Sequence, residues 1–313
     1  MANYTQISET ETQAILNLYG IQNIQKISPL SLGISNSNYR VDLKNQKSIL
    51  LKISDDKNPE QLADEQKILM YLSEKKYPFS LKPFLTSNGE SVYHFEKYFG
   101  VLFPFVEGIP PGPSDFTCKE VGHALAKLHS ISHDSNELKN LRSHEKVGFG
   151  ANEIYEYVQS KNCPIDFKEA FYNLFNDHLK EFRNTPFHKG IIHGDLYYDN
   201  TLFDQNKLSH VLDFEQAGIG EYILDLGISI SGTCLEKGRI INPLVKSYLE
   251  GYEEVRPLNK IESRFIHQAV LIGLFSISLW RIKRFKEGNL NPQMENSYRD
   301  LLLKAYEYEK MQN

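Results

Sequence analysis

The sequence contains few cysteines, and they form no recognisable pattern. Only three occur in 313 residues, Cys118, Cys163 and Cys234, and no two of them stand in a C-x-x-C arrangement. An odd number of widely separated cysteines predicts neither a disulfide framework nor a zinc site. The first residues also lack the basic and apolar regions of a signal peptide. We therefore expect the protein to work in the reducing cytoplasm.

Positive charge and long apolar runs are also scarce. The net charge is −5, which argues against a protein that binds nucleic acid or another polyanion. The longest apolar stretch, residues 269–280, has twelve residues, two of which are serine. Because a helix needs about 20 apolar residues to cross a bilayer, we expect this stretch to be a buried helix, and we predict no membrane association.

The length and the apolar content predict two lobes. With 313 residues and 41% hydrophobic content, the chain can bury a large core and exceeds the length at which a single core usually stops growing. Strand patterns dominate its first third and helix patterns the remainder, and a proline-rich stretch follows residue 104. We therefore expect an α+β fold with an N-terminal lobe, residues 1–104, and a mainly helical C-terminal lobe, residues 105–313.

A group of polar residues with a distinctive spacing stands in the second lobe. The segment H-G-D-L-Y-Y-D-N ends at Asn200, and Asp213 follows thirteen residues later. Residues 201–203 and 208–212 have the pattern of two strands around a turn. If the turn is Asn206-Lys207, the resulting hairpin pairs Asn200 with Asp213. The hairpin is therefore expected to bring an amide and a carboxylate together.

This spacing predicts a site for phosphoryl transfer. Asn200 and Asp213 both offer oxygen atoms, the ligands that Mg²⁺ prefers. Asp195 lies close to them in sequence and is a candidate proton acceptor for a substrate hydroxyl. The pattern H-x-D-x-x-x-x-N beginning at His193, with a further aspartate thirteen residues on, is that of a kinase catalytic loop and its metal-binding aspartate. Taken separately, the H-G-D segment and the polar residues near the two strands could instead be ordinary turns.

Two charged residues of the first lobe fit a nucleotide site. Lys52 stands in the apolar strand predicted for residues 48–53, although a lysine there could also be a solvated edge residue. The following helix carries Glu65 among leucines at 62, 69 and 72, so its carboxylate lies on an apolar face and needs a partner. We predict Lys52 as that partner, the arrangement that holds a kinase lysine on nucleotide phosphates.

A short polar turn, residues 33–37, precedes the second predicted strand. Its small residues, which include Ser35 and Asn36, would let backbone N–H groups approach phosphates. It contains one glycine where glycine-rich phosphate loops have two or three, so an ordinary hairpin turn is the alternative.

Three other polar residues are expected to be structural. Asp225 is an acid inside an apolar run and should be buried, accepting backbone hydrogen bonds as part of the scaffold. His123 and His129 share a predicted helix but lie about 240° apart around its axis, so they do not form a metal-binding pair.

These motifs resemble those of the aminoglycoside phosphotransferase and choline kinase family. The resemblance rests on the segment 33–39, Lys52, Glu65, the loop from His193 to Asn200, Leu212-Asp213-Phe214 and Asp225-Leu226. It covers nearly the whole chain and implies a two-lobed, protein-kinase-like fold. The implied activity is transfer of phosphate from ATP to the hydroxyl of a small molecule.

The resemblance also implies a role for each residue of the site. Asp195 would be the catalytic base and His193 would support its loop. Asn200 and Asp213 would bind Mg²⁺. Lys52 would contact the ATP phosphates, with Glu65 to orient it.

Within the family, the resemblance is closest to type II homoserine kinases, through Tyr4-Thr5 and the segments 207–214 and 280–284. Gly194 stands where alanine is usual in those enzymes, and Glu215 where an aromatic residue is usual, so the acceptor could differ. An aminoglycoside kinase or a choline or ethanolamine kinase is an alternative. From other classes, the alternatives are a catalytically silent binding module and a metal-dependent phosphoesterase. The sequence does not decide whether the phosphate donor is ATP or GTP, or whether the protein is a monomer or a homodimer.

Overall fold

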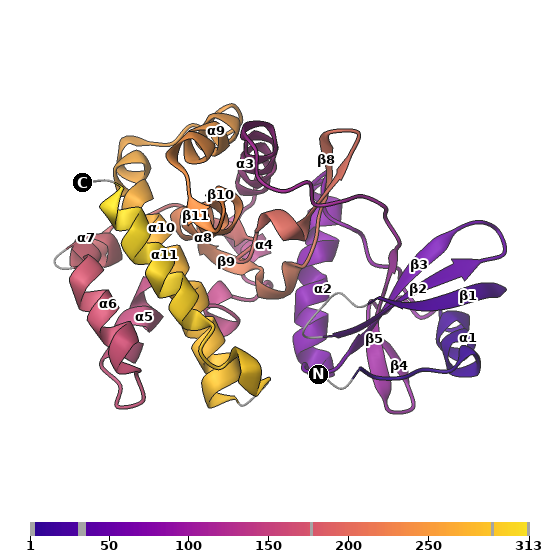
Figure 1. Ribbon diagram of the computed structural model, residues 1–313. Coiled ribbons are helices and arrows are strands. Elements are labelled where there is room, and N and C mark those ends of the chain that lie inside the picture. The colour runs from indigo at the N-terminus through magenta and orange to yellow at the C-terminus, as the bar shows by residue number, and fades with distance from the viewer. Residues whose placement is uncertain (1–3, 31–35, 176–177, 289–290, 312–313) are drawn as a thin grey trace. The chain divides into compact units, whose positions relative to one another are not determined.

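The computed structural model describes residues 4–30, 36–175, 178–288 and 291–311. The chain divides into two compact units, Met1–Gly108 and Ile109–Asn313, which Figure 1 colours along the sequence. The division comes after Gly108, whereas the sequence placed the lobe boundary after residue 104. The first unit combines an antiparallel sheet with helices, and the larger second unit is mainly helical. The predicted α+β class is confirmed.

The first unit is built on a five-stranded antiparallel sheet with the strand order β1-β2-β3-β5-β4. The strands are β1 (Ile24–Leu30), β2 (Asn36–Leu43), β3 (Ser48–Ser54), β4 (Tyr93–Phe95) and β5 (Tyr98–Pro104). Two helices accompany them, α1 (Glu9–Asn17) and α2 (Pro59–Glu74).

Alternation along β2 produces the buried face of this sheet. Tyr39, Val41 and Leu43 are all buried, while the residues between them are partly exposed, so the predicted period of two is confirmed. Ile15 and Leu16 of α1 join the same apolar core. A capping box starts α1, as the sequence predicted.

The second unit contains the remaining helices and three short two-stranded sheets. Its α-helices are α3 (Asp115–His129), α4 (Ser135–Leu138), α5 (Ala151–Val158), α6 (Ile165–Phe175), α7 (His178–Asn184), α8 (Tyr222–Thr233), α9 (Asn242–Glu253), α10 (Lys260–Arg281) and α11 (Tyr298–Lys310). Its strand pairs are β6 (Lys189–Ile192) with β9 (Gly218–Glu221), β7 (Thr201–Asp204) with β8 (Lys207–Val211), and β10 (Leu235–Glu236) with β11 (Arg239–Ile240). Its short 3₁₀ helices are η1 (His144–Lys146), η2 (Tyr198–Asn200), η3 (Phe214–Gln216) and η5 (Pro292–Met294). A π-helical segment, η4 (Ile282–Glu287), continues α10.

Helix α10 is the central helix of the second unit and packs against α8 and α11 (Figure 1). Glycines allow the close approach of α8, because a Cβ atom on Gly227 would lie 2.0 Å from the carbonyl oxygen of Ala269. Among the described residues, the helix Lys260–Glu287 is long and apolar enough to cross a membrane, yet 72% of its most apolar window is buried inside the protein. It is therefore packed as a core helix is, in agreement with the buried helix predicted here.

The hairpin of β7 and β8 differs in register from its prediction. Its turn is Gln205-Asn206, whose φ angles of 45° and 67° are those of a type I′ turn. The predicted turn lay one residue later and is wrong. Beyond a bulge in β8, the residue opposite Asn200 is Leu212, whose N–H donates to the Asn200 carbonyl at 2.8 Å. Asp213 follows directly, so the hairpin still delivers the amide and the carboxylate to the same end.

The first residue of the second unit is tied to this hairpin. The N–H of Ile109 donates to the carbonyl of Phe203 at 3.3 Å, and the N–H of Phe203 donates to the carbonyl of Ile109 at 3.0 Å. Ile109 thus pairs with β7 as a single antiparallel bridge.

Candidate active site

Asp225 holds the loop that contains Asp195. Its carboxylate accepts the backbone N–H of His193 at 2.7 Å and that of Gly194 at 2.8 Å, and His129 bonds to it at 3.0 Å. Burial would raise the pKa of Asp225, but the bonds from His129 and from the loop hold it below its ordinary value. The predicted buried scaffold acid is confirmed.

His193 connects the same loop to the residue that precedes Asp213. Its Nε2–H donates to the carbonyl of Leu212 at 2.8 Å, and its Nδ1 accepts the N–H of Asp195 at 3.2 Å. One nitrogen donates and the other accepts, so the ring is neutral. Burial lowers the pKa of His193, which favours this form.

The loop also fixes the orientation of Asn200. Its side-chain nitrogen donates to the main-chain carbonyl of Asp195 at 2.8 Å, so the amide oxygen is the atom left to face a cation. Asp213 is exposed and has φ 61° and ψ 61°, a left-handed conformation that is uncommon for residues other than glycine. Strained backbone of this kind is often found at functional sites.

Carboxylates gather around Asp195. Burial raises the pKa of Asp195 well above its ordinary value, and the negative charges of Asp213, Asp199 and Glu215 raise it further. The positive charge of Arg281 acts in the opposite direction. This half-buried acid therefore stands in a region of concentrated negative charge, which a divalent cation would neutralise.

Two buried basic residues that no sequence pattern indicated hold the segment after Asp213. Arg142 donates from Nε to the carbonyl of Ala217 and from Nη2 to that of Glu215, both at 2.7 Å. His144 donates from Nδ1 to the carbonyl of Gln216 at 2.8 Å. An isolated arginine or histidine in a loop carries no periodicity, so the sequence offered no signal for either role.

Gly194 is required by the packing of this loop. Its φ is +78°, and a Cβ atom there would lie 2.7 Å from the carbonyl oxygen of Gln216 and 2.7 Å from the ring of His144. Any residue with a Cβ atom at this position would therefore meet both backbone strain and a close contact.

We expect Gly194→Ala to lower the free energy of unfolding by about 2–3 kcal/mol, because backbone strain and a clash with main-chain oxygen add together. Gly238→Ala is the matched control, since Gly238 has φ +80° and nothing within 4 Å of its added Cβ. Strain alone should cost that variant about 1 kcal/mol. Urea unfolding of both variants measures the difference, and equal losses would show that the contact with Gln216 does not matter.

The residues predicted to bind nucleotide lie in the first unit. Lys52 stands in the middle of β3, opposite Asn38 of β2 and Val101 of β5. Glu65 is 2% exposed on the apolar face of α2, as predicted, and forms an ion pair with Lys57 at 2.9 Å. The sequence predicted Lys52 as the partner of Glu65 and gave no indication of Lys57.

The turn before β2 is only partly described. Ser35 lies outside the described residues, and Asn36 is the buried first residue of β2. The hydroxyl of the next residue, Ser37, donates to Asp55 at 2.6 Å and accepts the N–H of Thr5 at 2.7 Å. The start of β2 is thus held by an acid that follows β3 and by the N-terminal segment.

Both the sequence and the fold of this chain are similar to those of known proteins. The phosphotransferase enzyme family matches residues 26–258. The homoserine kinase of Polaromonas naphthalenivorans is 26% identical over 289 residues, which cover 91% of this chain and 90% of that protein. An amicoumacin kinase in complex with AMP-PNP and Ca²⁺ has a TM-score of 0.70 at 13% identity, covering 97% of this chain and 94% of that one.

An ethanolamine kinase of Plasmodium vivax has a TM-score of 0.67 at 16% identity, covering 97% of this chain and 91% of that one. At these identities the structural likeness shows the fold, whereas the family match extends over most of the sequence. The chain belongs to the phosphotransferase enzyme family and is a small-molecule phosphotransferase with a protein-kinase-like fold.

Proposed function

We propose that the enzyme transfers the γ-phosphate of ATP to the hydroxyl of homoserine and uses Mg²⁺. The observation that carries the proposal is the group of carboxylates around Asp195, on a loop that Asp225 locks through two backbone hydrogen bonds. This group supplies a proton acceptor beside oxygen ligands. The similarity to a homoserine kinase over 91% of this chain supports homoserine as the acceptor.

Asp195 is the proposed base. In the reaction, the hydroxyl oxygen of the acceptor bonds to the γ-phosphorus of ATP, and the bond from that phosphorus to the β–γ bridging oxygen breaks. The hydroxyl proton passes to a carboxylate oxygen of Asp195, whose raised pKa suits it to take up a proton. His193 supports this step by holding the backbone N–H of Asp195.

Asn200 and Asp213 are the proposed ligands of Mg²⁺. One carboxylate and one amide oxygen match a cation that usually takes one or two protein carboxylates and fills its other positions with water and phosphate oxygens. The orientation of the Asn200 amide supports this role. When bound, Mg²⁺ would neutralise negative charge on the phosphates of ATP.

The first unit is the proposed nucleotide-binding lobe. Lys52 would contact the phosphates of ATP with Glu65 orienting it, and the turn that includes Ser35 and Asn36 would face them. The second unit is the proposed catalytic and acceptor-binding lobe. We place the enzyme in the cytoplasm, with small molecules as its substrates.

Turnover with a panel of acceptors tests the proposal. The purified protein is given Mg·ATP with homoserine, ethanolamine, choline, an aminoglycoside or methylthioribose, and ADP release is followed by a coupled assay. We expect the highest kcat/KM with homoserine and none in EDTA. A higher value with another acceptor would replace homoserine, and nucleotide binding without turnover on any acceptor would indicate a silent binding module.

Arg281 can distinguish an amino-acid acceptor from an amino alcohol. It is the last residue of α10, donates from Nη1 to the carbonyl of Ser297 at 2.8 Å, and its charge acts on both Asp195 and Tyr197. The sequence makes Arg281 available as a cation for the carboxylate of an amino-acid acceptor, although solvated surface charge is the commoner role of such an arginine. Its remaining guanidinium donors suit the carboxylate of an amino acid.

We expect Arg281→Met to raise the KM for homoserine about 10-fold to 100-fold, the loss of hydrogen bonds to a charged group. The KM for 3-aminopropanol, which is homoserine without its carboxylate, should change little. Arg239→Met is the control, because Arg239 forms an exposed ion pair with Glu307. Equal effects of Arg281→Met on both acceptors would rule out a role for Arg281 in binding the carboxylate.

A further inference from the structure

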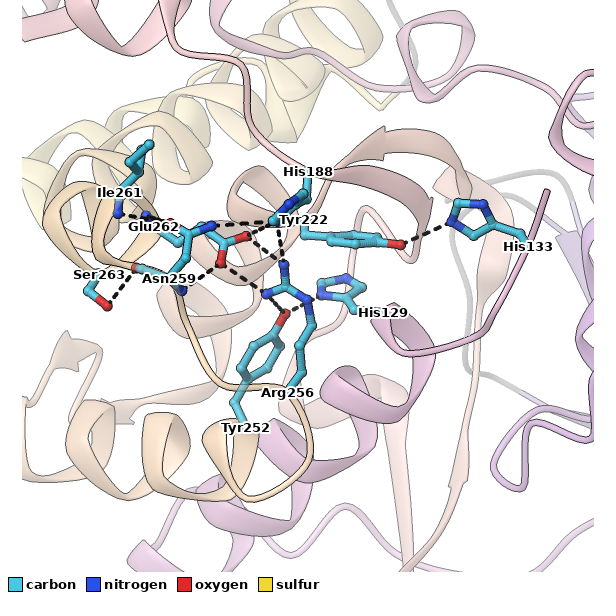
Figure 2. A network of polar contacts seen from close by, with 10 residues as sticks. All are labelled: His129, His133, His188, Tyr222, Tyr252, Arg256, Asn259, Ile261, Glu262 and Ser263. Carbon is cyan, nitrogen blue, oxygen red and sulfur yellow. Dashed lines mark hydrogen bonds and ion pairs between the residues drawn. The ribbon is translucent and has the colours of Figure 1, made fainter. Parts of the chain in front are cut away.

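A series of polar contacts leads from Asp225 to the segment between α9 and α10. His129 bonds through Nε2 to Asp225 at 3.0 Å and through Nδ1 to the hydroxyl of Tyr252 at 2.7 Å. Arg256 bonds to the same hydroxyl from Nη1 at 3.1 Å (Figure 2). Asp225, His129 and Tyr252 are buried. Two side chains, His129 and Tyr252, thus connect the acid that holds the loop to the guanidinium of Arg256.

The acid at one end of this series, which only accepts, and the cation at the other end, which only donates, set the direction of its hydrogen bonds. A guanidinium can only donate, so the oxygen of Tyr252 accepts from Arg256. The hydroxyl proton of Tyr252 is then directed to Nδ1 of His129, which accepts it. His129 must therefore carry its own proton on Nε2, where it donates to Asp225.

The surroundings of His129 keep its ring neutral, so that the position of one proton matters. Burial lowers the pKa of His129, while the charge of Asp225 opposes this and that of Arg256 adds to it. Tyr222 stacks on the ring at a centroid distance of 4.4 Å. The more distant Glu262 also acts to raise the pKa, but the net direction is downward.

Arg256 itself is rigidly held. Its guanidinium forms a two-bond ion pair with Glu262, at 2.6 Å and 3.3 Å, and donates to Nδ1 of His188 at 3.2 Å. Glu262 is 1% exposed and also accepts the N–H of Asn259 at 3.1 Å, which closes the capping box of α10 (Figure 2). The orientation of the Arg256 donors is therefore fixed by the start of a core helix.

We propose that Arg256 is a positioning residue for phosphoryl transfer. By donating to Tyr252, it directs the Tyr252 hydroxyl proton to Nδ1 of His129, which supports the Nε2–H tautomer that the Asp225 carboxylate requires, and so maintains one of the donors that hold Asp225 under the loop of Asp195. This inference rests on the proposed function, because it takes that loop as the catalytic one. Without Arg256, the Tyr252 hydroxyl is free to accept from Nδ1 of His129, so the preference for the Nε2–H tautomer falls and the bond from His129 to Asp225 weakens.

The test compares three variants with the wild-type enzyme. Arg256→Met removes the donors but keeps an unbranched side chain, and Arg256→Lys keeps a cation that can only donate. Arg264→Met is the control, because it makes the same chemical change outside the series. Arg264 lies on α10 in an exposed ion pair with Glu181. Steady-state kinetics give kcat and KM, and ¹⁵N NMR of the histidine rings reports the tautomer of His129 without any substrate.

We expect Arg256→Met to lower kcat on the order of 10-fold, because Asp195, the proposed base, is misplaced. The KM for ATP and the KM for homoserine should change little, because the contacts that bind the substrates remain. The ¹⁵N shifts of His129 should move from the Nε2–H pattern towards Nδ1–H. In Arg256→Lys and in Arg264→Met, kcat and the ¹⁵N shifts of His129 should both stay close to the wild-type values. An unchanged His129 tautomer in Arg256→Met, or a kcat equal to that of Arg264→Met, would overturn the inference.

A second variant keeps the inference testable if Arg256→Met does not fold. Tyr252→Phe removes the hydroxyl from the series and leaves the pair of Arg256 and Glu262 intact, and it should produce the same shift of tautomer and the same fall in kcat. An unchanged tautomer in Tyr252→Phe would also contradict the inference. Absence of turnover in the wild-type enzyme contradicts the proposed function instead, and the NMR result would still decide the tautomer.

Discussion

Replacing Asp195 by asparagine is expected to lower kcat by about 10²-fold to 10⁴-fold, the usual contribution of a general base. The amide has nearly the same shape but cannot take up the proton of the acceptor hydroxyl. Binding of Mg·ATP should persist, because the proposed ligands Asn200 and Asp213 are unchanged. The melting temperature of the metal-free protein should not fall, since the substitution removes a charge that neighbouring carboxylates disfavour.

Asp199→Asn is the matched control for this result. Asp199 is exposed on the same loop, and its charge acts on Asp195. The same chemical change there should alter kcat only slightly. Coupled ADP assays with isothermal titration of nucleotide separate turnover from binding, and comparable losses in the two variants would refute Asp195 as the base.

Replacing Asp225 by asparagine is expected to lower the free energy of unfolding by about 3–5 kcal/mol. The acid is fully buried and accepts three hydrogen bonds, from His193, Gly194 and His129. An amide offers one accepting oxygen and places an NH₂ group against a donor, so at least one buried N–H loses its partner. Urea unfolding at neutral pH, followed by circular dichroism, measures the loss.

The effect of Asp225→Asn should depend on pH. The pKa of Asp225 lies below its ordinary value, so its contribution to stability is complete above that value and is lost as the pH falls through the folded-state pKa. The difference between variant and wild type should therefore narrow in acid. Asp300→Asn, at an exposed position on α11, should stay within about 0.5 kcal/mol of wild type; a similar small loss in Asp225→Asn would contradict the scaffold role.

Features that depend on local periodicity could be predicted from the sequence. The alternation of β2 and the apolar stripe of α2 with Glu65 inside it both appear in the structure. The burial of Asp225 followed from the cost of leaving a charge in an apolar run without hydrogen bonds. In each case, residues that are close in sequence determine which side chains are buried.

Features that depend on distant partners could not be predicted in this way. Arg142 meets the carbonyl of Ala217, and Arg256 reaches the hydroxyl of Tyr252 and the carboxylate of Glu262, through contacts that no spacing rule indicates. The hairpin register failed for a different reason. Both Gln205-Asn206 and Asn206-Lys207 are plausible turns. The earlier turn shifts the pairing by two residues, and the bulge in β8 restores one of them.

The bridge between Ile109 and Phe203 links the residues around Gly108 directly to the strand that follows Asn200, one of the proposed metal ligands. Because β7 begins immediately after Asn200, any displacement of the polypeptide at Gly108 would be transmitted through main-chain bonds to the strand that follows this amide. If Asn200 and Asp213 bind Mg²⁺ as proposed, adding or removing a residue next to Gly108 would change the affinity for the metal without replacing either ligand.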